Sequence, residues 1–239
     1  MECLKAGKLT GAFSRLEFRN DDRYDTACPE GHRSSTLLQQ QRFELLFDIG
    51  AYAVLDGYYR EAVSSFSGSL ERFYEFALRV LLFHTSNSDK LFKKTWKLVA
   101  SQSERQLGAF VFAWATKFNE APEAFPGRLT SFRNDVVHKG KIPSRAEAVE
   151  FGDAVLAYMR PMLTLILESF PEETIRVTHY HLQDRGQTAP DGPRSTMCID
   201  TIISISSADS ATRSEPLQYY LLKLAKERAA LSQFGSTGK

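Results

Sequence analysis

Arginine, asparagine and histidine stand close together in the stretch SFRNDVVHKGKIPS, which runs from residue 131 to 144. Histidine moves protons readily near neutral pH, and arginine carries a permanent charge that grips a phosphate through two parallel N–H donors. His138 can therefore handle the proton of a ribose 2′-hydroxyl or of a leaving group, while Arg133 stabilises the charge that develops on the phosphate. DNA lacks the 2′-hydroxyl, so this pair predicts cleavage of RNA without a metal ion.

The spacing within this stretch decides which side chains can meet. On a helix, Asn134 and His138 share a face, and Asp135 lies close by at a spacing of three from His138. Either Asn134 or Asp135 can orient the imidazole, and Asp135 can equally be a surface acid paired with Arg133 or Lys139. Arg133 is about 140° around the helix from His138, so a regular helix does not aim both at one small target.

Two arrangements bring Arg133 and His138 together. In the first, the helix distorts near Gly140, a residue type that commonly ends helices. In the second, the same segment of another chain faces it across a two-fold axis, and the two chains complete one cleft. That arrangement needs a surface of small residues, which residues 64–69 (SSFSGS) offer. We place this patch at the dimer interface as a hypothesis.

Helical patterns fill residues 37–170 and must position this stretch. The strongest helix spans residues 58–84, where apolar side chains recur every three or four residues. Ser144 and Glu147 have the spacing of a capping box, which predicts a long helix to about Ser169 with a kink at Pro161.

The flanking segments differ from this helical part. Residues 1–36 look extended and turn-rich, with a short hairpin or irregular lid. After residue 170, TIRVTHYHLQ and STMCIDTIISIS alternate or carry β-branched residues, which favours a β-hairpin, and an amphipathic helix closes the chain within residues 171–239. The fold class we expect is mainly α, a helical bundle with these two additions.

The motif and its setting resemble a known family. An arginine followed by a polar residue, with a histidine four to six residues after the arginine at the end of a helix, is similar to the HEPN superfamily (higher eukaryotes and prokaryotes nucleotide-binding). Here the matching residues are Arg133, Asn134 and His138, and the helix GYYREAVSSFSGSLERFYEFALRVLL resembles the family's long early helix. The resemblance covers about residues 37–170, and the flanks resemble additions found in longer prokaryotic members.

The resemblance implies a homodimeric, metal-independent endoribonuclease with two Arg–His sets in one cleft at the dimer interface. Such proteins are common in toxin–antitoxin, phage-defence and RNA-processing systems, so an antitoxin or regulatory partner is implied as well. Products would carry 2′,3′-cyclic phosphate and 5′-hydroxyl ends. Some members keep the fold without nuclease activity, so a non-catalytic RNA- or nucleotide-binding dimer is the alternative. A structural interaction module that uses the C-terminal amphipathic helix is a third hypothesis.

Composition favours a soluble globular chain of 239 residues. Hydrophobic residues make up 43% and charged residues 25%, and the formal net charge is +1, so any nucleic-acid binding must depend on a local patch. The cysteines Cys3, Cys28 and Cys198 are few and widely spaced, which suits a reducing compartment. No signal-peptide core or membrane-length apolar run is evident, so we expect a cytoplasmic protein.

A helix face rich in lysine is the candidate RNA-binding surface. Lys90, Lys93, Lys94 and Lys97 fall within residues 88–100, and Lys139 follows the motif histidine. Each phosphate contact would make binding more sensitive to salt. A solvated helix face is the competing interpretation, and Trp96, inside this run, fits the core better than a base-stacking surface.

Metal ligands are sparse, and we expect no metal or cofactor. Cys28 and His32 in CPEGH are half of a zinc site at best, with Cys3 as a third ligand and no evident fourth. A buried thiol beside a tight turn is the simpler interpretation. His179 and His181 have strand spacing and would share one face, but nothing else in the sequence supports a metal there.

Overall fold

The computed structural model describes residues 17–28, 30–206 and 214–234, with side chains in the last segment described to residue 230. The chain forms two compact units. One comprises Gln41–Thr174 with Asp200–Lys239, and the other comprises Met1–Gln40 with Ile175–Ile199. The sequence-based boundaries at residues 37 and 171 stay a prediction. The division into units differs from them in assigning residues 200–239 to the helical unit.

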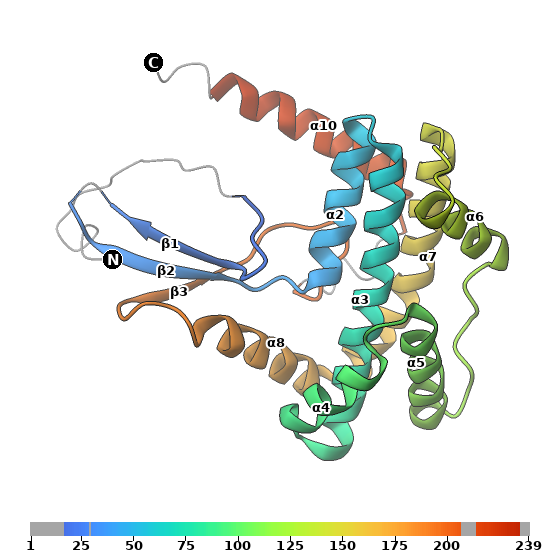
Figure 1. Ribbon diagram of the computed structural model, residues 1–239. Coiled ribbons are helices and arrows are strands. Elements are labelled where there is room, and N and C mark those ends of the chain that lie inside the picture. The colour runs from blue at the N-terminus through green and yellow to red at the C-terminus, as the bar shows by residue number, and fades with distance from the viewer. Residues whose placement is uncertain (1–16, 29, 207–213, 235–239) are drawn as a thin grey trace. The chain divides into compact units, whose positions relative to one another are not determined.

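The mainly helical fold is confirmed. The larger unit contains α2 (Arg42–Leu55), α3 (Tyr59–Ser86), α4 (Asp89–Val99), α5 (Ser103–Phe118), α6 (Gly127–His138), α7 (Arg145–Ser169) and α10 (Leu217–Phe234). Helix α3 lies at its centre and packs against α2, α4, α5, α6 and α7 (Figure 1). The motif residues Arg133, Asn134 and His138 all lie on α6, which packs against α3.

The core between α2 and α3 is built from aromatic side chains. Phe47 and Phe66 have ring centroids 4.9 Å apart, and Phe43 packs edge-on against Phe73 at 5.7 Å. All four rings are fully buried. Gly50 lies against Phe66, and a Cβ at this position would come within 2.6 Å of that ring. A glycine inside α2 is therefore a packing requirement that outweighs its poor helix propensity.

Helix α7 begins as its sequence predicts. The backbone N–H of Ser144 donates to Glu147 Oε2 (2.8 Å), and the backbone N–H of Glu147 donates to Ser144 Oγ (3.3 Å), which completes the capping box. A hydrogen bond from Lys141 lowers the pKa of Glu147 to about 2, with the Ser144 donors adding to the effect. The helix continues through Pro161 to Ser169.

Two buried carboxyl groups on α2 hold the segment 200–206. Glu44 Oε1 accepts a hydrogen bond from the backbone N–H of Ile205 (2.9 Å), and Asp48 Oδ1 accepts one from Ile202 (3.0 Å). Burial raises the pKa of both carboxyl groups to about 7, because desolvation disfavours the charged form.

The smaller unit is a three-stranded sheet with most of one helix. Strand β1 (Arg23–Ala27) pairs antiparallel with β2 (Arg33–Leu38), which confirms the short N-terminal hairpin. Strand β3 (Arg194–Met197) joins the other edge of β2 in parallel, with Ser35 opposite Arg194. Helix α8 (Pro171–Gly186) contributes its residues from Ile175 onward, and its buried His181 contacts the Leu38 carbonyl at 3.3 Å.

The expectation of a C-terminal β-hairpin is wrong for its first arm. Residues 174–183 lie inside α8, and the second arm supplies only the short β3, which pairs with β2. Pro171 begins α8, and two glutamates follow it in the first turn, both of which favour a helix start. Buried Val177 and His181 are one helical turn apart, and the exposed His179 does not share their side.

None of the helices in the described part of the chain combines the length and the apolar content that crossing a membrane requires.

Candidate functional site

Arg133 is held by side chains from three helices. Its Nε donates to Ser67 Oγ (2.8 Å), and its Nη2 donates to Glu71 Oε1 (2.7 Å) and to Ser103 Oγ (3.4 Å). Its Nη1 donates to Asn134 Oδ1 (3.0 Å). These four bonds fix the guanidinium plane between α3, α5 and α6.

Glu71 neutralises the charge of Arg133. The two side chains form an ion pair at 2.7 Å and are only 25% and 16% exposed, respectively. A guanidinium has five N–H donors, and the bonds to the described residues use four of them. One Nη1 N–H is therefore left for an incoming acceptor such as a phosphate oxygen.

The small residues of α3 make this contact possible. Ser67 and Glu71 are four residues apart, so both face α6. Ser67 is buried beneath the guanidinium, where a larger side chain would take its space. Ser69 is also buried and donates to the Phe43 carbonyl at 2.7 Å, which brings α2 close to α3. Ser69 therefore serves packing inside the chain, so the hypothesis that residues 64–69 form the dimer surface is wrong for this residue, while Ser67 lies beside Arg133.

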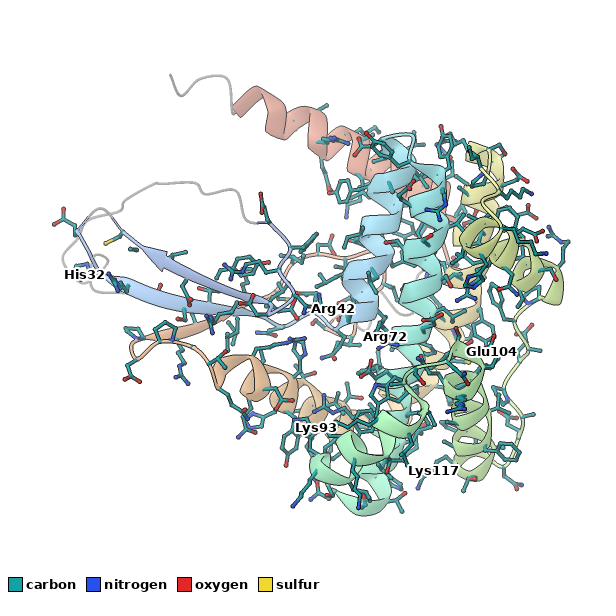
Figure 2. The ribbon with its side chains drawn as sticks, in the orientation of Figure 1. His32, Arg42, Arg72, Lys93, Glu104 and Lys117 are labelled. Carbon is teal, nitrogen blue, oxygen red and sulfur yellow. The ribbon has the colours of Figure 1, made fainter. Side chains whose placement is uncertain are left out.

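The Arg133 pocket is a small cavity of about 120 Å³ beside this network. One wall is polar and the other apolar, and its lining comprises Ser67, Leu70, Glu71, Tyr74, Ser103, Glu104, Leu107, Phe125, Thr130, Arg133, Asn134 and Phe151. Glu104, at the start of α5, is labelled in Figure 2. The pocket is small for a whole ligand, since sites for drug-sized molecules span about 300–1,000 Å³. It suits a single group placed beside the guanidinium.

Aromatic rings close the apolar wall of this pocket. Phe125 packs edge-on against Phe151 at 6.0 Å and against Tyr158 at 5.4 Å. Burial raises the pKa of Tyr74 well above its usual value, and its contact with Tyr158 adds to the effect. Tyr74 therefore stays protonated near neutral pH and does not serve as a proton acceptor.

His138 lies outside the Arg133 pocket. It is the last residue of α6 and is exposed to solvent, and its side chain makes no hydrogen bond with any described residue. Helix α6 keeps its helical conformation to His138, and the positive φ of Gly140 (76°) comes only after the helix has ended. The structure therefore does not bring Arg133 and His138 to one point by distorting the helix within a single chain.

Asp135 is engaged by lysine rather than by histidine. Lys139 Nζ lies 2.9 Å from Asp135 Oδ1, and both side chains are substantially exposed. The Asp135 carbonyl also accepts the backbone N–H groups of Lys139 and Lys141, which close the end of α6. Of the two roles open to Asp135 from its sequence position, the surface ion pair is the one present in the structure.

The lysines of α4 are all exposed. Exposure is required both for a surface that binds an RNA backbone and for a merely solvated helix face, so it does not distinguish the two interpretations. Lys93, labelled in Figure 2, pairs with Asp89 at 2.7 Å. Trp96 on the same helix is half-buried and stacks on Phe92 at 6.0 Å, so it packs inward. Arg72 lies over the Trp96 ring at 5.6 Å and is thereby directed away from the Arg133 pocket.

Cys28 and His32 meet across the β1–β2 turn, with Sγ and Nδ1 3.5 Å apart. Within residues 17–28, 30–206 and 214–234, no group of three or more histidine, cysteine or acidic side chains is arranged to hold a metal ion. Cys3 lies outside the described residues.

Sequence reasoning found Arg133 and Asn134 but not the residues that hold them. Glu71 is 62 positions away in the sequence. The one available signal is the i, i+4 spacing of Ser67 and Glu71 on the long helix predicted for residues 58–84. Nothing in the sequence pointed to Ser103.

No protein-family model, curated protein or solved structure matches this chain.

Proposed function

We propose that this protein is a metal-independent endoribonuclease of the HEPN type that acts as a homodimer. The observation that carries the proposal is the fixed Arg133, which lines a small pocket and keeps one N–H without a bond to the described residues, together with the exposed His138 at the end of the same helix. Arginine and histidine at such a site can bind a phosphate and transfer protons to and from its oxygens.

The chemistry assigns separate roles to three side chains. His138 takes the proton of the 2′-hydroxyl or gives one to the leaving 5′-oxygen, and Arg133 stabilises the charge on the phosphorane. Asn134 holds the Arg133 guanidinium through its Oδ1 and can offer its amide group to a phosphate. The products are a 2′,3′-cyclic phosphate and a 5′-hydroxyl, because the ribose oxygen is the nucleophile.

We propose the dimer because of where the two groups lie. The His138 side chain is exposed and bonds to none of the residues that the structure describes, while Arg133 is fixed by three helices. A two-fold axis near the end of α6 places His138 of the partner subunit against the Arg133 pocket of the first chain. Each chain then contributes to both catalytic sets in one cleft.

Glu71 is a positioning residue in this scheme. Its carboxylate holds Arg133 in place and offsets the guanidinium charge before RNA binds, and Glu104 adds a second carboxyl group to the pocket lining. A site without excess positive charge and a chain with a net charge of +1 suit a selected or regulated substrate rather than bulk RNA. The lysines at positions 90, 93, 94, 97 and 139 are proposed to contact the RNA backbone. We also propose a cytoplasmic location and a role in toxin–antitoxin, phage-defence or RNA-processing systems.

The test is RNA cleavage in EDTA by the wild type, the His138→Ala variant and a His84→Ala control. His84 is also exposed but lies on α3 and contacts Glu173 at 3.1 Å. Cleavage of tRNA or total RNA by the wild type and the control, but not by His138→Ala, supports the proposal. Equal cleavage by all three proteins overturns the assignment of His138.

A non-catalytic RNA- or nucleotide-binding dimer is the second candidate. It is favoured by the neutralisation of Arg133 and by the lack of any group that orients His138 within the described chain. If this second function is correct, neither the wild type nor the two histidine variants cleaves RNA. Arg133→Ala then binds RNA more weakly than the wild type does. An antitoxin-like or other regulatory partner would then act on the dimer.

A further inference from the structure

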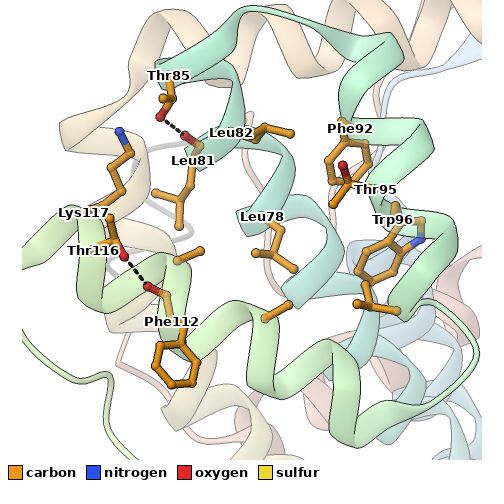
Figure 3. Close-up of a pocket in the computed structure, with 13 residues that line it drawn as sticks. Leu78, Leu81, Leu82, Thr85, Phe92, Thr95, Trp96, Phe112, Thr116 and Lys117 are labelled. Carbon is orange, nitrogen blue, oxygen red and sulfur yellow. Dashed lines mark hydrogen bonds between the residues drawn. The ribbon is translucent and has the colours of Figure 1, made fainter.

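A second cavity lies between α3, α4 and α5, on a different part of the helical unit from the Arg133 pocket (Figure 3). Its volume is about 340 Å³, which is in the lower range of small-molecule sites. Helix α3 supplies its floor with Leu78, Leu81, Leu82 and Thr85, whose i, i+3, i+4, i+7 spacing presents one continuous face. We refer to this cavity as the apolar groove.

The groove stays open because small side chains stand where large ones would fill it. Ala109 and Ala113 form much of the α5 wall, while Phe92 and Trp96 form the α4 wall. Phe112 also borders the groove, but its ring extends outward and is 78% exposed (Figure 3). Helices α4 and α5 leave Leu78 and Leu82 of α3 half-buried along the groove, while Leu81 is buried.

Two threonine hydroxyl groups of the groove have hydrogen-bond partners, whereas the Lys117 ammonium bonds to none of the described residues. Thr116 Oγ1 donates to the Phe112 carbonyl (2.7 Å) and Thr85 Oγ1 to the Leu81 carbonyl (3.5 Å), so these hydroxyls are bonded within their own helices. Lys117 is the one charged side chain among the described residues that line the groove. It is half-buried and forms no ion pair or hydrogen bond with the described residues.

We propose that the apolar groove binds an amphiphilic monoanion, with its aliphatic or aromatic body in the groove and its carboxylate at Lys117. The apolar walls remove the body of the ligand from water, and the unpaired ammonium supplies the complementary charge at one end of the groove. This site is independent of the proposed ribonuclease activity, because none of its residues contacts Arg133.

The occupant is a free amphiphile rather than a nucleic acid or a membrane. Walls of leucine, alanine and aromatic carbon offer nothing to a phosphate backbone, which seeks cationic and N–H donors. Lys94 is two residues from both Phe92 and Trp96, so it lies on the opposite side of α4 from the groove. A concave apolar site with one lysine among its lining residues fits a single amphiphilic molecule better than it fits a flat bilayer surface.

The test is calorimetric titration of the full chain with decanoate and with decanol, both below their aggregation limits. We expect decanoate to bind the wild type and Lys117→Gln to weaken that binding about tenfold, while decanol binds both proteins equally. Lys94→Gln, the matched control on the far side of α4, should bind decanoate as the wild type does. Ala113→Phe fills the groove and should abolish the binding of both ligands.

Fluorescence gives an independent readout that does not depend on the groove-filling variant. Trp96 lines the groove and Trp114 is buried elsewhere in the core, so decanoate should change the emission of the wild type but not that of Trp96→Phe.

The proposal is overturned if decanoate does not bind the wild type, or binds Lys117→Gln with unchanged affinity. It is also overturned if anionic vesicles or acidic amphipathic peptides bind and decanoate does not. A dimer that Ala113→Phe dissociates would show instead that a second copy of the chain covers the groove.

Discussion

At the scale of single residues, the environment of Arg133 is the feature that sequence reasoning could not supply. The motif gave the arginine and its neighbour Asn134, but the carboxylate and the two hydroxyls that fix the guanidinium come from α3 and α5. The i, i+4 spacing of Ser67 and Glu71 shows that they share one face of a helix, but nothing local in the sequence shows that this face meets Arg133. For Asp135 the sequence leaves two roles open, an orienting group or a surface acid, and the structure shows an ion pair with Lys139.

Glu71→Gln should lower the rate of RNA cleavage by about 100-fold, since small displacements of a catalytic group cost this much. The amide keeps the shape of the side chain but loses the charge that anchors Arg133, so kcat should fall more than KM rises. The matched control is Glu75→Gln, on the same helix, whose carboxylate pairs with Arg72 at 2.7 Å and does not contact Arg133. Single-turnover kinetics of both variants, with unfolding midpoints recorded alongside, would measure the effect. An equal loss in the two variants would contradict a positioning role for Glu71.

At the scale of elements, local signals predicted most helices and failed where two signals competed. The apolar stripe of α3 and the capping box of α7 are short-range patterns, and both are present in the structure. The segment 174–183 carries β-branched residues, but Pro171 and the acidic first turn start a helix there. Within residues 64–69, Ser69 lies inside the chain rather than on a dimer surface, because burial depends on which helix packs opposite, and α2 lies there.

The buried carboxyl groups of α2 predict a pH dependence of folding. Glu44 and Asp48 have pKa values of about 7 in the folded chain, raised by burial from their ordinary values of 4.5 and 3.8. Asp200 adds to the shift at Asp48, and Lys223 opposes it. A raised acid pKa means that the folded chain binds the proton more tightly, so stability falls as pH rises from about 4 to about 7 and then levels off.

Urea unfolding at pH 5 and pH 8 would test this dependence. The Glu44→Gln/Asp48→Asn double variant should lose less free energy of unfolding between the two pH values than the wild type loses. Glu150→Gln, which replaces an exposed acid of α7, should keep the wild-type difference. A double variant with the same pH dependence as the wild type would show that these two groups are not responsible.

At the scale of the whole molecule, the account depends on an assembly of two chains. Within one chain, Arg133 is enclosed and His138 is exposed, and α6 is helical between them. The sequence anticipated this geometry, because five residues on a regular helix turn the two side chains about 140° apart. The surface that would join two chains could not be predicted, since the small-residue patch is in part internal.

Mixing inactive subunits tests the shared cleft. Arg133→Ala and His138→Ala proteins should each be inactive as homodimers, but a mixed dimer contains one intact arginine and one intact histidine. If these two groups come from different chains, the mixture regains a measurable fraction of wild-type cleavage. Two affinity tags would isolate the mixed dimer and prove that the subunits exchange. An isolated mixed dimer with no activity would contradict a cleft that both chains complete.

The most direct test of the central claim is the chemistry of the cleaved ends. A defined RNA is incubated with the purified protein in EDTA, and the products are analysed by mass spectrometry, beside the same RNA with a 2′-deoxy nucleotide at the cleavage position. The account predicts 2′,3′-cyclic phosphate and 5′-hydroxyl ends, no cleavage at the 2′-deoxy position, and no cleavage by His138→Ala. Cleavage at the 2′-deoxy position, or 5′-phosphate ends that appear only when a divalent cation is added, would contradict it.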